Sequence, residues 1–422
     1  MCDSLCSIQP DRTLFAKSSD RPPGEPQVIG AHRRRAGVGL LRTQYRSLPD
    51  AGAAPLVGSQ PDWLWGFEHG FNEHRVAIGN EQLWTIDDPV PAADSLNGMD
   101  LVRLGLERAR TATEALDTIV GLIEAHGQGG IGDREAGKAY FSSFLLADPG
   151  EAWVLETSGR SWAARPVLAG QGGAALSNRI SLSTDWTRAS ADVAASGDFD
   201  RWRRSSSPTA HADKRLAVTR AGARSVEEGA GRLATGADDS RASTGARELA
   251  AVLRDHDGER WGRPGSPPER VTALPPAVID RLGTGVSVCM HLSGVQATTS
   301  SMIASLPRHL DEPLRAWIAP GNPCVAVFVP TFGIDGVAAE LGHATTWHRF
   351  EALREQVEHD RSTDPGGGGL GRLLEVRAVL TPLESDLWDE ADALVESGPG
   401  PQVAWALGLW PRVDAALAAL GV

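Results

Sequence analysis

Polar and apolar residues alternate at the start of the chain, and this alternation predicts a β-hairpin. The alternation covers residues 4–8, Pro10-Asp11-Arg12 follows it, and an extended pattern resumes over 13–16. A period of two is typical of strands, and proline and aspartate favour turns. Further short strand-like runs follow at 38–48 and 75–86.

The clearest helical pattern lies between residues 97 and 130. Apolar residues recur there at spacings of three and four: Leu101, Leu104, Leu116, Ile119, Val120 and Ile123. A break at 108–113, with Thr111 or Thr113 as a cap before Glu114, predicts two amphipathic helices. The glycines at 127–130 then end the second helix.

Three short strand-like runs follow at 140–149, 151–159 and 161–168, separated by glycine-containing turns. This pattern favours an antiparallel meander. Because strands precede and follow the two helices without regular βαβ alternation, the pattern indicates an α+β fold.

Between residues 186 and 332, a polar segment is followed by two strand-like runs. Residues 186–275 are polar and rich in Arg, Ala and Ser, and we expect helices joined by mobile loops there. Two further strand-like runs lie at 286–292 and 324–332.

The last part of the chain has a different pattern. Segments 345–361 and 372–397 have helical periodicity, and the glycine-rich segment 364–371 between them is a predicted hinge. We therefore expect a main domain over residues 1–335 and a helical C-terminal extension over 336–422. No internal repeat is identified.

Charge and hydropathy exclude some classes of protein. The 422 residues include 54 acidic and 41 basic ones, a formal net charge of -13, which disfavours nucleic-acid binding. The basic run at 32–35 is interpreted as a solvated loop. No secretory signal pattern and no run of about eighteen apolar residues is present, so we expect a cytoplasmic protein without a membrane partner.

Cysteine usage gives no sign of a metal site. The four cysteines lack paired spacing: Cys2, Cys6, Cys289 and Cys324. The histidines considered as partners lack compact ligand spacing as well: His69, His74, His126 and His291. We therefore expect free thiols, no metal and no cofactor, with a Cys2–His dyad as a minor alternative.

Cys2 follows the initiator methionine directly, and cysteine is small enough for that methionine to be trimmed. The trimmed chain would carry an α-amine, with an ordinary pKa of about 7.7 to 8.0, beside a thiol of about 8.5. The amine can then accept the thiol proton, which makes Cys2 a nucleophile with its own base. The alternative is an ordinary buried thiol.

Several motifs follow Cys2 in a recognisable order: FAKSSDRP, PDWLWGFEHGFNEHRVAIGNEQLWT, GMDLVRLGLER, EAHGQGG, EAWVLETSGRSWAA and LSNRISLSTD. This series resembles the secernins, a branch of the dipeptidase family of cysteine N-terminal-nucleophile (Ntn) hydrolases. The similarity runs in register from Cys2 to about Asp185, with a weaker echo at 289–307. It implies the Ntn-hydrolase αββα sandwich, two antiparallel sheets packed face to face and covered by helices, as the catalytic domain.

The resemblance also implies roles for individual residues. Cys2 matches the nucleophile, and Asp20 matches the acidic residue that holds the N-terminal amine. Lys17 lies where related acylases have an arginine, and Ser18 replaces the usual asparagine. Without the resemblance, Lys17 and Asp20 would be interpreted as a surface ion pair of little energetic value.

Three further polar residues are candidates for the catalytic site. Asn80 matches a residue whose amide can donate to the oxyanion of a tetrahedral intermediate. Asn178 matches a second asparagine near the nucleophile, and Arg215 is a weaker candidate for a neighbouring arginine. Both asparagines are equally typical of strand-end turns.

Trp63, Trp65 and Trp84 are candidates for the wall of a substrate pocket, because aromatic side chains around a few polar groups suit small molecules. Core packing is the alternative for at least two of them.

The sequence therefore favours a hydrolase of C–N bonds that cleaves a small amide or dipeptide bond, with a small molecule or short peptide as its partner. A catalytically weak, secernin-like scaffold or regulatory protein is the competing hypothesis, and a thiol redox protein is the third. A homo-oligomer is left open.

Overall fold

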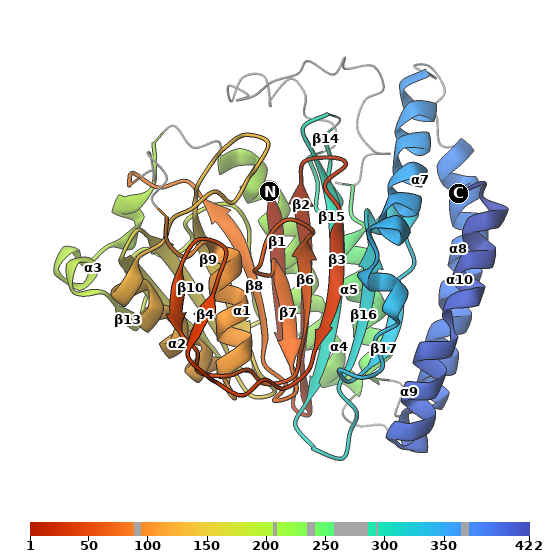
Figure 1. The fold of residues 1–422 in the computed structure, drawn as a ribbon, viewed down its shortest axis with the longest axis horizontal. Helices are drawn as coiled ribbons and strands as arrows, with labels where there is room; N and C mark the ends of the chain where they lie inside the picture. Colours follow the sequence, from red (N-terminus) through yellow and green to blue (C-terminus); the bar gives the residue numbers. More distant parts are fainter. Residues whose placement is uncertain (88–93, 206–208, 234–240, 257–285, 293, 364–370) are drawn as a thin grey trace.

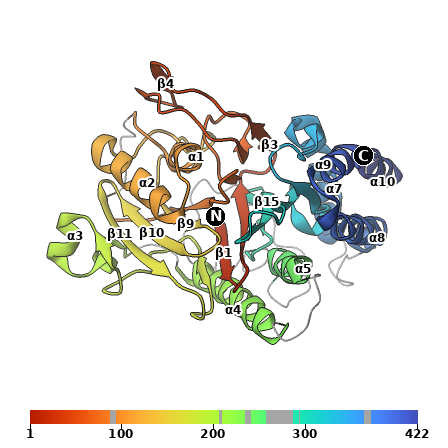
Figure 2. The same cartoon turned by 90° about the horizontal axis from the view of Figure 1, so that it is seen from below.

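The computed structural model describes residues 1–87, 94–205, 209–233, 241–256, 286–292, 294–363 and 371–422. Two antiparallel sheets pack face to face, and helices cover both outer faces (Figures 1 and 2). The expected α+β class and αββα layer order are confirmed.

The first sheet has seven strands and contains the N-terminal hairpin. Its path is β12 (Ala174–Leu176), β1 (Cys2–Ile8), β2 (Arg12–Arg21), β15 (Gln296–Pro307), β16 (Arg315–Pro320) and β17 (Val329–Phe332), with β14 (His291–Leu292) paired to β15. The hairpin register places Cys2 opposite Ser19 and Ser4 opposite Lys17. The predicted hairpin is confirmed, and its long second strand lies at the centre of the sheet.

The second sheet has eight strands. Their order is β13 (Arg188–Ala189), β11 (Ser161–Val167), β10 (Ala152–Ser158), β9 (Phe141–Ala147), β8 (Ala77–Leu83), β7 (His69–Asn72), β6 (Leu56–Pro61) and β3 (Gln27–His32). The predicted meander corresponds to β9, β10 and β11. The predicted strand at 38–48 instead forms a small separate hairpin of β4 (Leu40–Arg42) and β5 (Ser47–Pro49).

Helices α1 (Gly98–Arg108) and α2 (Ala112–His126) cover the second sheet, as their apolar faces predict. Asn97 and Thr111 cap them by accepting hydrogen bonds from backbone N–H groups, which satisfies donors that a helix start leaves unpaired. Apolar side chains of both helices form one buried cluster with the outward face of the sheet.

Helices α4 (Thr209–Leu233) and α5 (Arg241–Leu253) cover the first sheet, and the short helix α3 (Ala191–Ser196) lies beside β11. The helices expected in the polar segment 186–275 are thus present in its described part. Residues 206–208, 234–240 and 257–275 of that segment lie outside the described residues.

The C-terminal part is helical, as expected, with α7 (Ala344–Thr363), α8 (Gly371–Ala393), α9 (Pro399–Gly408) and α10 (Trp410–Ala419). These helices lie beside β3, β16 and β17 (Figure 1), and their apolar residues join the largest core cluster. The predicted hinge at 364–371 falls almost entirely outside the described residues. No helix of the described part is long and apolar enough to cross a membrane.

Candidate active site

Cys2 is the first residue of β1, and the residue is only 6% exposed. Its backbone N–H donates to Asn178 Oδ1 at 2.7 Å. Met1 precedes it, and the Met1 amine donates to Gln296 Oε1 at 2.8 Å. The Met1 side chain packs against a small cluster of Val286, Met290 and Leu292. Met1 therefore covers the end of β1 where Cys2 lies.

Arg215 on α4 donates hydrogen bonds to three groups around the backbone of Cys2. One guanidinium nitrogen donates to the Cys2 carbonyl at 3.2 Å and to Asp3 Oδ2 at 2.5 Å, and another donates to Asn178 Oδ1 at 2.9 Å. The Asn178 amide nitrogen donates to the Gln82 carbonyl at 3.0 Å, which fixes its oxygen toward Cys2. Asn178 and Arg215, two residues far apart in the sequence, thus meet at the Cys2 backbone.

Asp20 lies on the same face of the first sheet as Asp3 and Arg215. Its Oδ1 accepts a hydrogen bond from Thr298 at 2.8 Å, and the Arg215 guanidinium is 4.0 Å from Oδ2. That second oxygen is buried and has no hydrogen-bond partner among the described residues. Burial raises the pKa of Asp20 to about 6, although the Met1 amine and Arg215 act in the opposite direction.

Lys17 lies on the other face of β2, between the two sheets. It is fully buried, its ammonium donates to the Ser18 carbonyl at 3.1 Å, and Glu81 Oε1 is 3.6 Å away. Burial opposes its charge, whereas Cys2 and then Glu81 raise its pKa above the ordinary value. Lys17 is therefore not the surface residue of the alternative interpretation, but the cation of a buried ion pair.

Burial also controls the thiol of Cys2. Desolvation raises its pKa above the ordinary value, and the Lys17 ammonium and the Met1 amine reverse only part of this effect. With Met1 attached, the Cys2 thiol is therefore protonated at neutral pH. A base is needed before it can act as a nucleophile.

Asn80 does not face Cys2. Residues of β8 alternate between faces, so Asn80 shares the outward face with Ile78, beneath α1, while Glu81 points inward to Lys17. Its amide contacts Met99 Sδ at 3.6 Å and Ser142 Oγ at 3.4 Å. With the amide oxygen and nitrogen exchanged, it donates to the Glu68 carbonyl at 2.9 Å. No hydrogen bond among the described residues joins Asn80 to Cys2, and the oxyanion role remains a prediction.

A second buried network lies beside Cys2 and was not expected from the sequence. Arg21, next to Asp20 on β2, donates to Glu25 at 2.6 Å, to Glu68 at 3.1 Å and to the Tyr140 hydroxyl at 3.4 Å. All four residues are buried. The only sequence signals were that Arg21 follows the KSSD motif and that Glu68 lies between the tryptophans. The network itself could not be predicted, because its contacts join segments that are distant in sequence.

The three tryptophans have different surroundings. Trp63 is half-buried and packs in a cluster with Met99 and Tyr140, next to the Arg21 network. Trp65 instead packs beneath the Arg103 guanidinium, 4.2 Å from its ring centre, on the α1 side of the second sheet. Trp84 is half-buried and follows directly after β8. Trp63 is therefore the tryptophan whose contacts lead to the candidate site.

The histidines do not form a dyad with Cys2 among the described contacts. His69 Nδ1 is 3.1 Å from Ser19 Oγ, and burial together with Lys17 holds the His69 pKa well below its ordinary value. His74 is in a turn beside Glu73, and His126 ends α2. His291 lies beside Cys289 and Cys324.

No family model matches the chain. Among solved structures, penicillin V acylase from Agrobacterium tumefaciens aligns with 76% of this chain and 83% of its own, at a TM-score of 0.44 and 10% identity. The C2A mutant of conjugated bile acid hydrolase from Clostridium perfringens aligns with 75% of this chain and 88% of its own, at a TM-score of 0.37 and 10% identity.

A third solved structure is the Caenorhabditis elegans ortholog of N-acylethanolamine-hydrolyzing acid amidase. It aligns with 43% of this chain and 70% of its own, at a TM-score of 0.29 and 12% identity. These similarities are partial and distant.

Proposed function

We propose that this chain is a cysteine hydrolase of amide bonds, with Cys2 as the nucleophile after Met1 is removed and the new α-amine as the base. The observation that carries the proposal is the surroundings of the Cys2 nitrogen. Asn178 Oδ1 already accepts its N–H and also accepts from Arg215. The same guanidinium is 4.0 Å from the buried Asp20 Oδ2, which has no hydrogen-bond partner among the described residues. A buried acceptor without a partner costs free energy, and a newly formed ammonium would supply a donor.

Removal of Met1 would change this end of the hairpin in two ways. It would convert the Cys2 N–H into an amine that Asn178 can still hold, and it would expose the end of β1 that Met1 covers. The amine is attached to the residue that carries the thiol, so proton transfer is direct or passes through one water.

The reaction then follows in two balanced steps. The Cys2 sulfur bonds to the amide carbonyl, its proton passes through the α-amine to the leaving nitrogen, and the C–N bond breaks to give a thioester and a free amine. Water next attacks the thioester, the α-amine accepts its proton, and the acid and the thiol are released. The Lys17 ammonium, buried between the sheets, would stabilise negative charge that develops at sulfur.

Within this class we propose a short peptide or another small amide as substrate, and a dipeptidase-like, secernin-like activity. The motif series from Cys2 to about Asp185 supports the finer assignment. The Arg21, Glu25 and Glu68 network beside Trp63 offers both charges next to an aromatic surface, which suits a small substrate with charged ends.

The test uses purified protein whose N-terminus has been determined. It measures hydrolysis of a panel of dipeptides, N-acylated amino acids and acylated amines. The matched control for Cys2→Ala is Cys6→Ala, because Cys6 is a buried thiol on the same strand. We expect turnover by the wild type and Cys6→Ala, and none by Cys2→Ala. Equal turnover by Cys2→Ala would refute the proposal.

One observation favours the scaffold alternative. The Met1 amine is hydrogen-bonded to Gln296, and the Met1 side chain packs against an apolar cluster. A chain that keeps Met1 in its own host would have no amine base on Cys2, and the fold would then serve binding only. Determination of the N-terminus of natively expressed protein separates the two functions.

A further inference from the structure

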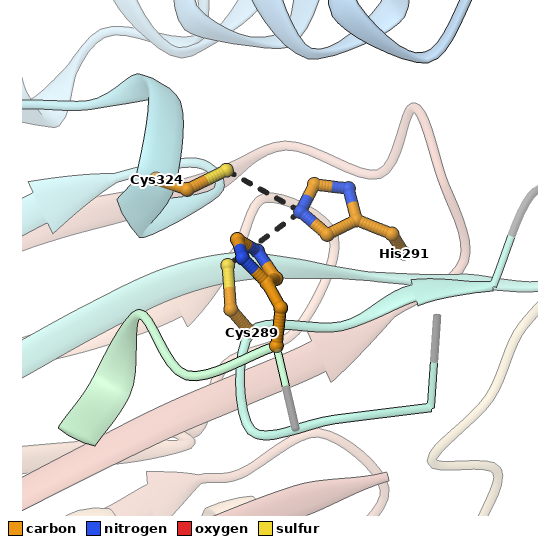
Figure 3. Close-up of side chains that lie close together, drawn as sticks. Cys289, His291 and Cys324 are labelled. Carbon is orange, nitrogen blue, oxygen red and sulfur yellow. Dashed lines mark hydrogen bonds between the residues drawn. The ribbon is translucent and has the colours of Figure 1, made fainter. Parts of the chain in front are cut away.

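Two cysteines and two histidines from separate segments converge beside β14, at one end of the first sheet. His291 Nε2 is 3.3 Å from Cys324 Sγ and 3.6 Å from Cys289 Sγ (Figure 3). One donor atom each from His256, Cys289, His291 and Cys324 lies within 4.8 Å of the other three. These are the nitrogen and sulfur donors that structural zinc sites use.

The cluster joins three parts of the chain. His256 follows α5, Cys289 and His291 lie at β14, and Cys324 lies in the short 3-10 helix η2 (Pro323–Val325). Residues 257–285, between the first two parts, are outside the described residues. The four residues lack compact spacing in the sequence, but the fold brings them together from distant segments.

The distances fit a tetrahedral ion. With Zn–S bonds of about 2.3 Å and Zn–N bonds of about 2.0–2.1 Å, a sulfur and a nitrogen on one tetrahedron are about 3.6 Å apart. The two N–S distances in the cluster are 3.3 and 3.6 Å. We propose that His256, Cys289, His291 and Cys324 form a structural Zn²⁺ site.

An independent observation supports the role of His291 as a ligand. Its other ring nitrogen, Nδ1, lies 3.0 Å from Glu358 Oε1 on α7, and Arg354 holds the second oxygen of that carboxylate at 2.5 Å. A carboxylate behind a histidine is the usual second partner in zinc sites, because it fixes the ring with the free nitrogen toward the metal. Here the other ring nitrogen, Nε2, faces both sulfurs.

Charge also favours Zn²⁺ in this place. Cys289, His291 and Cys324 are buried, and two buried thiolates without a cation would be costly. Zn²⁺ with two thiolates and two neutral imidazoles has no net charge. Four protein ligands leave no open position, so the site would stabilise the fold and would not activate water.

The competing arrangement is a pair of thiols. Asn322 Oδ1 is 2.8 Å from Cys289 Sγ and 3.2 Å from Cys324 Sγ, so it can accept an S–H bond from each. Zinc binding would replace these two bonds and release two thiol protons, giving two Zn–S bonds. The two arrangements therefore differ in metal content, in protons released and in thiol reactivity.

The site would also support the residues behind Cys2. Met290, between the two ligands Cys289 and His291, donates its backbone N–H to Thr298 Oγ1 at 2.8 Å, and Thr298 donates to Asp20. Zinc would thus fix the segment that positions Asp20. The inference does not depend on amide hydrolysis, because metal content is measured without a substrate.

The experiment is zinc analysis of the full-length protein, expressed and purified without chelators. We expect about one zinc per chain in the wild type and in the control Cys6→Ser, and about tenfold less in Cys324→Ser. Wild-type protein that carries no zinc, and takes up neither Zn²⁺ nor Co²⁺ after reduction, would overturn the proposal. A disulfide between Cys289 and Cys324 in protein purified under reducing conditions would overturn it as well.

A second measurement covers the case in which Cys324→Ser does not fold. Co²⁺ bound to the wild type in place of zinc should give thiolate-to-cobalt charge-transfer bands and the intense visible bands of a tetrahedral ion. Glu358→Gln, which leaves all four ligands in place, should weaken zinc binding about 10- to 100-fold. Cobalt spectra without thiolate bands, or unchanged zinc affinity in Glu358→Gln, would contradict the site as drawn.

Discussion

The side-chain oxygen of Asn178 accepts the backbone N–H of Cys2 at 2.7 Å, and the same oxygen accepts Arg215 at 2.9 Å. Three segments therefore meet at one nitrogen: the start of β1, the loop after β12 and helix α4. In a chain without Met1 this nitrogen is the α-amine. The groups that would hold a catalytic amine are thus already in place around a peptide nitrogen.

The first prediction concerns Arg215. Arg215→Ala leaves Asp3 as a buried carboxylate without its cation, and breaking a buried ion pair in this way typically costs about 3–5 kcal/mol of unfolding free energy. Urea denaturation followed by circular dichroism measures this loss. The matched control is Arg224→Ala on the exposed side of the same helix, which should change stability by less than about 0.5 kcal/mol. Equal losses in both variants would contradict the described network.

The second prediction concerns Lys17 and the Cys2 thiol. The double variant Lys17→Met/Glu81→Gln removes the buried ion pair together, so that neither charge is left alone. Since the Lys17 ammonium lowers the Cys2 pKa against burial, its loss should raise that pKa further and slow alkylation of Cys2 at pH 8. Peptide mapping after iodoacetamide treatment measures the rate.

Cys6 serves as the internal reference for this experiment. Burial raises the Cys6 pKa to about 12, so it should remain unmodified in both proteins. An unchanged Cys2 rate in a folded double variant would show that Lys17 does not act on the thiol.

The third prediction is a pH dependence of stability. The folded-state pKa of Asp20 is about 6 against an ordinary value of 3.8, so the folded chain binds this proton more tightly than the unfolded chain. Ionised Asp20 therefore lowers stability, and this cost grows as the pH rises from about 4 to 6 and is fully present above that. Relative to Asp20→Asn, the unfolding free energy of the wild type should fall by roughly 2 kcal/mol between pH 4 and 7. A difference that stays constant or rises with pH would contradict the assignment.

The fourth prediction uses two glycines. A Cβ on Gly79 would overlap Lys17 Cδ, so Gly79→Ala must displace the Lys17 side chain from its position between the sheets. We expect a loss of about 1–3 kcal/mol. Gly121→Ala in the exposed middle of α2, where nothing lies within 4 Å, should instead stabilise by up to about 1 kcal/mol. The melting temperature should therefore fall for Gly79→Ala and rise for Gly121→Ala. Shifts of the same sign would contradict the described packing.

The pattern of polar and apolar residues predicted the strands and helices whose sequences have a clear periodicity. The hairpin of β1 and β2, the two helices capped at Asn97 and Thr111, and the meander β9 to β11 each repeat a period of two or of three to four over many residues. The segments at 286–292 and 324–332 were expected to be strands but contribute only β14 and β17. Their remaining residues leave the sheet, and these include Cys289 and Cys324.

Contacts between distant segments explain what the sequence could not predict. Lys17 with Glu81, Arg215 with Asp3, and the Cys289, His291 and Cys324 cluster each join side chains from separate elements. Asn80 shows the same limit from the other side: its motif suggested a catalytic amide, whereas alternation along β8 places its side chain toward α1, and the oxyanion role remains a prediction. Which face a single side chain occupies depends on sheet register, which the motif did not contain.

The central claim is that Cys2 acts as an N-terminal nucleophile. The most direct measurement is mass spectrometry of natively expressed protein, intact and after proteolysis, before and after acid quenching with an amide substrate that it hydrolyses. We predict a chain that begins at Cys2 and, after quenching, an acyl group on the Cys2 peptide that is absent from Cys2→Ala. Complete retention of Met1, or amide turnover that persists in Cys2→Ala without an adduct, would contradict the account.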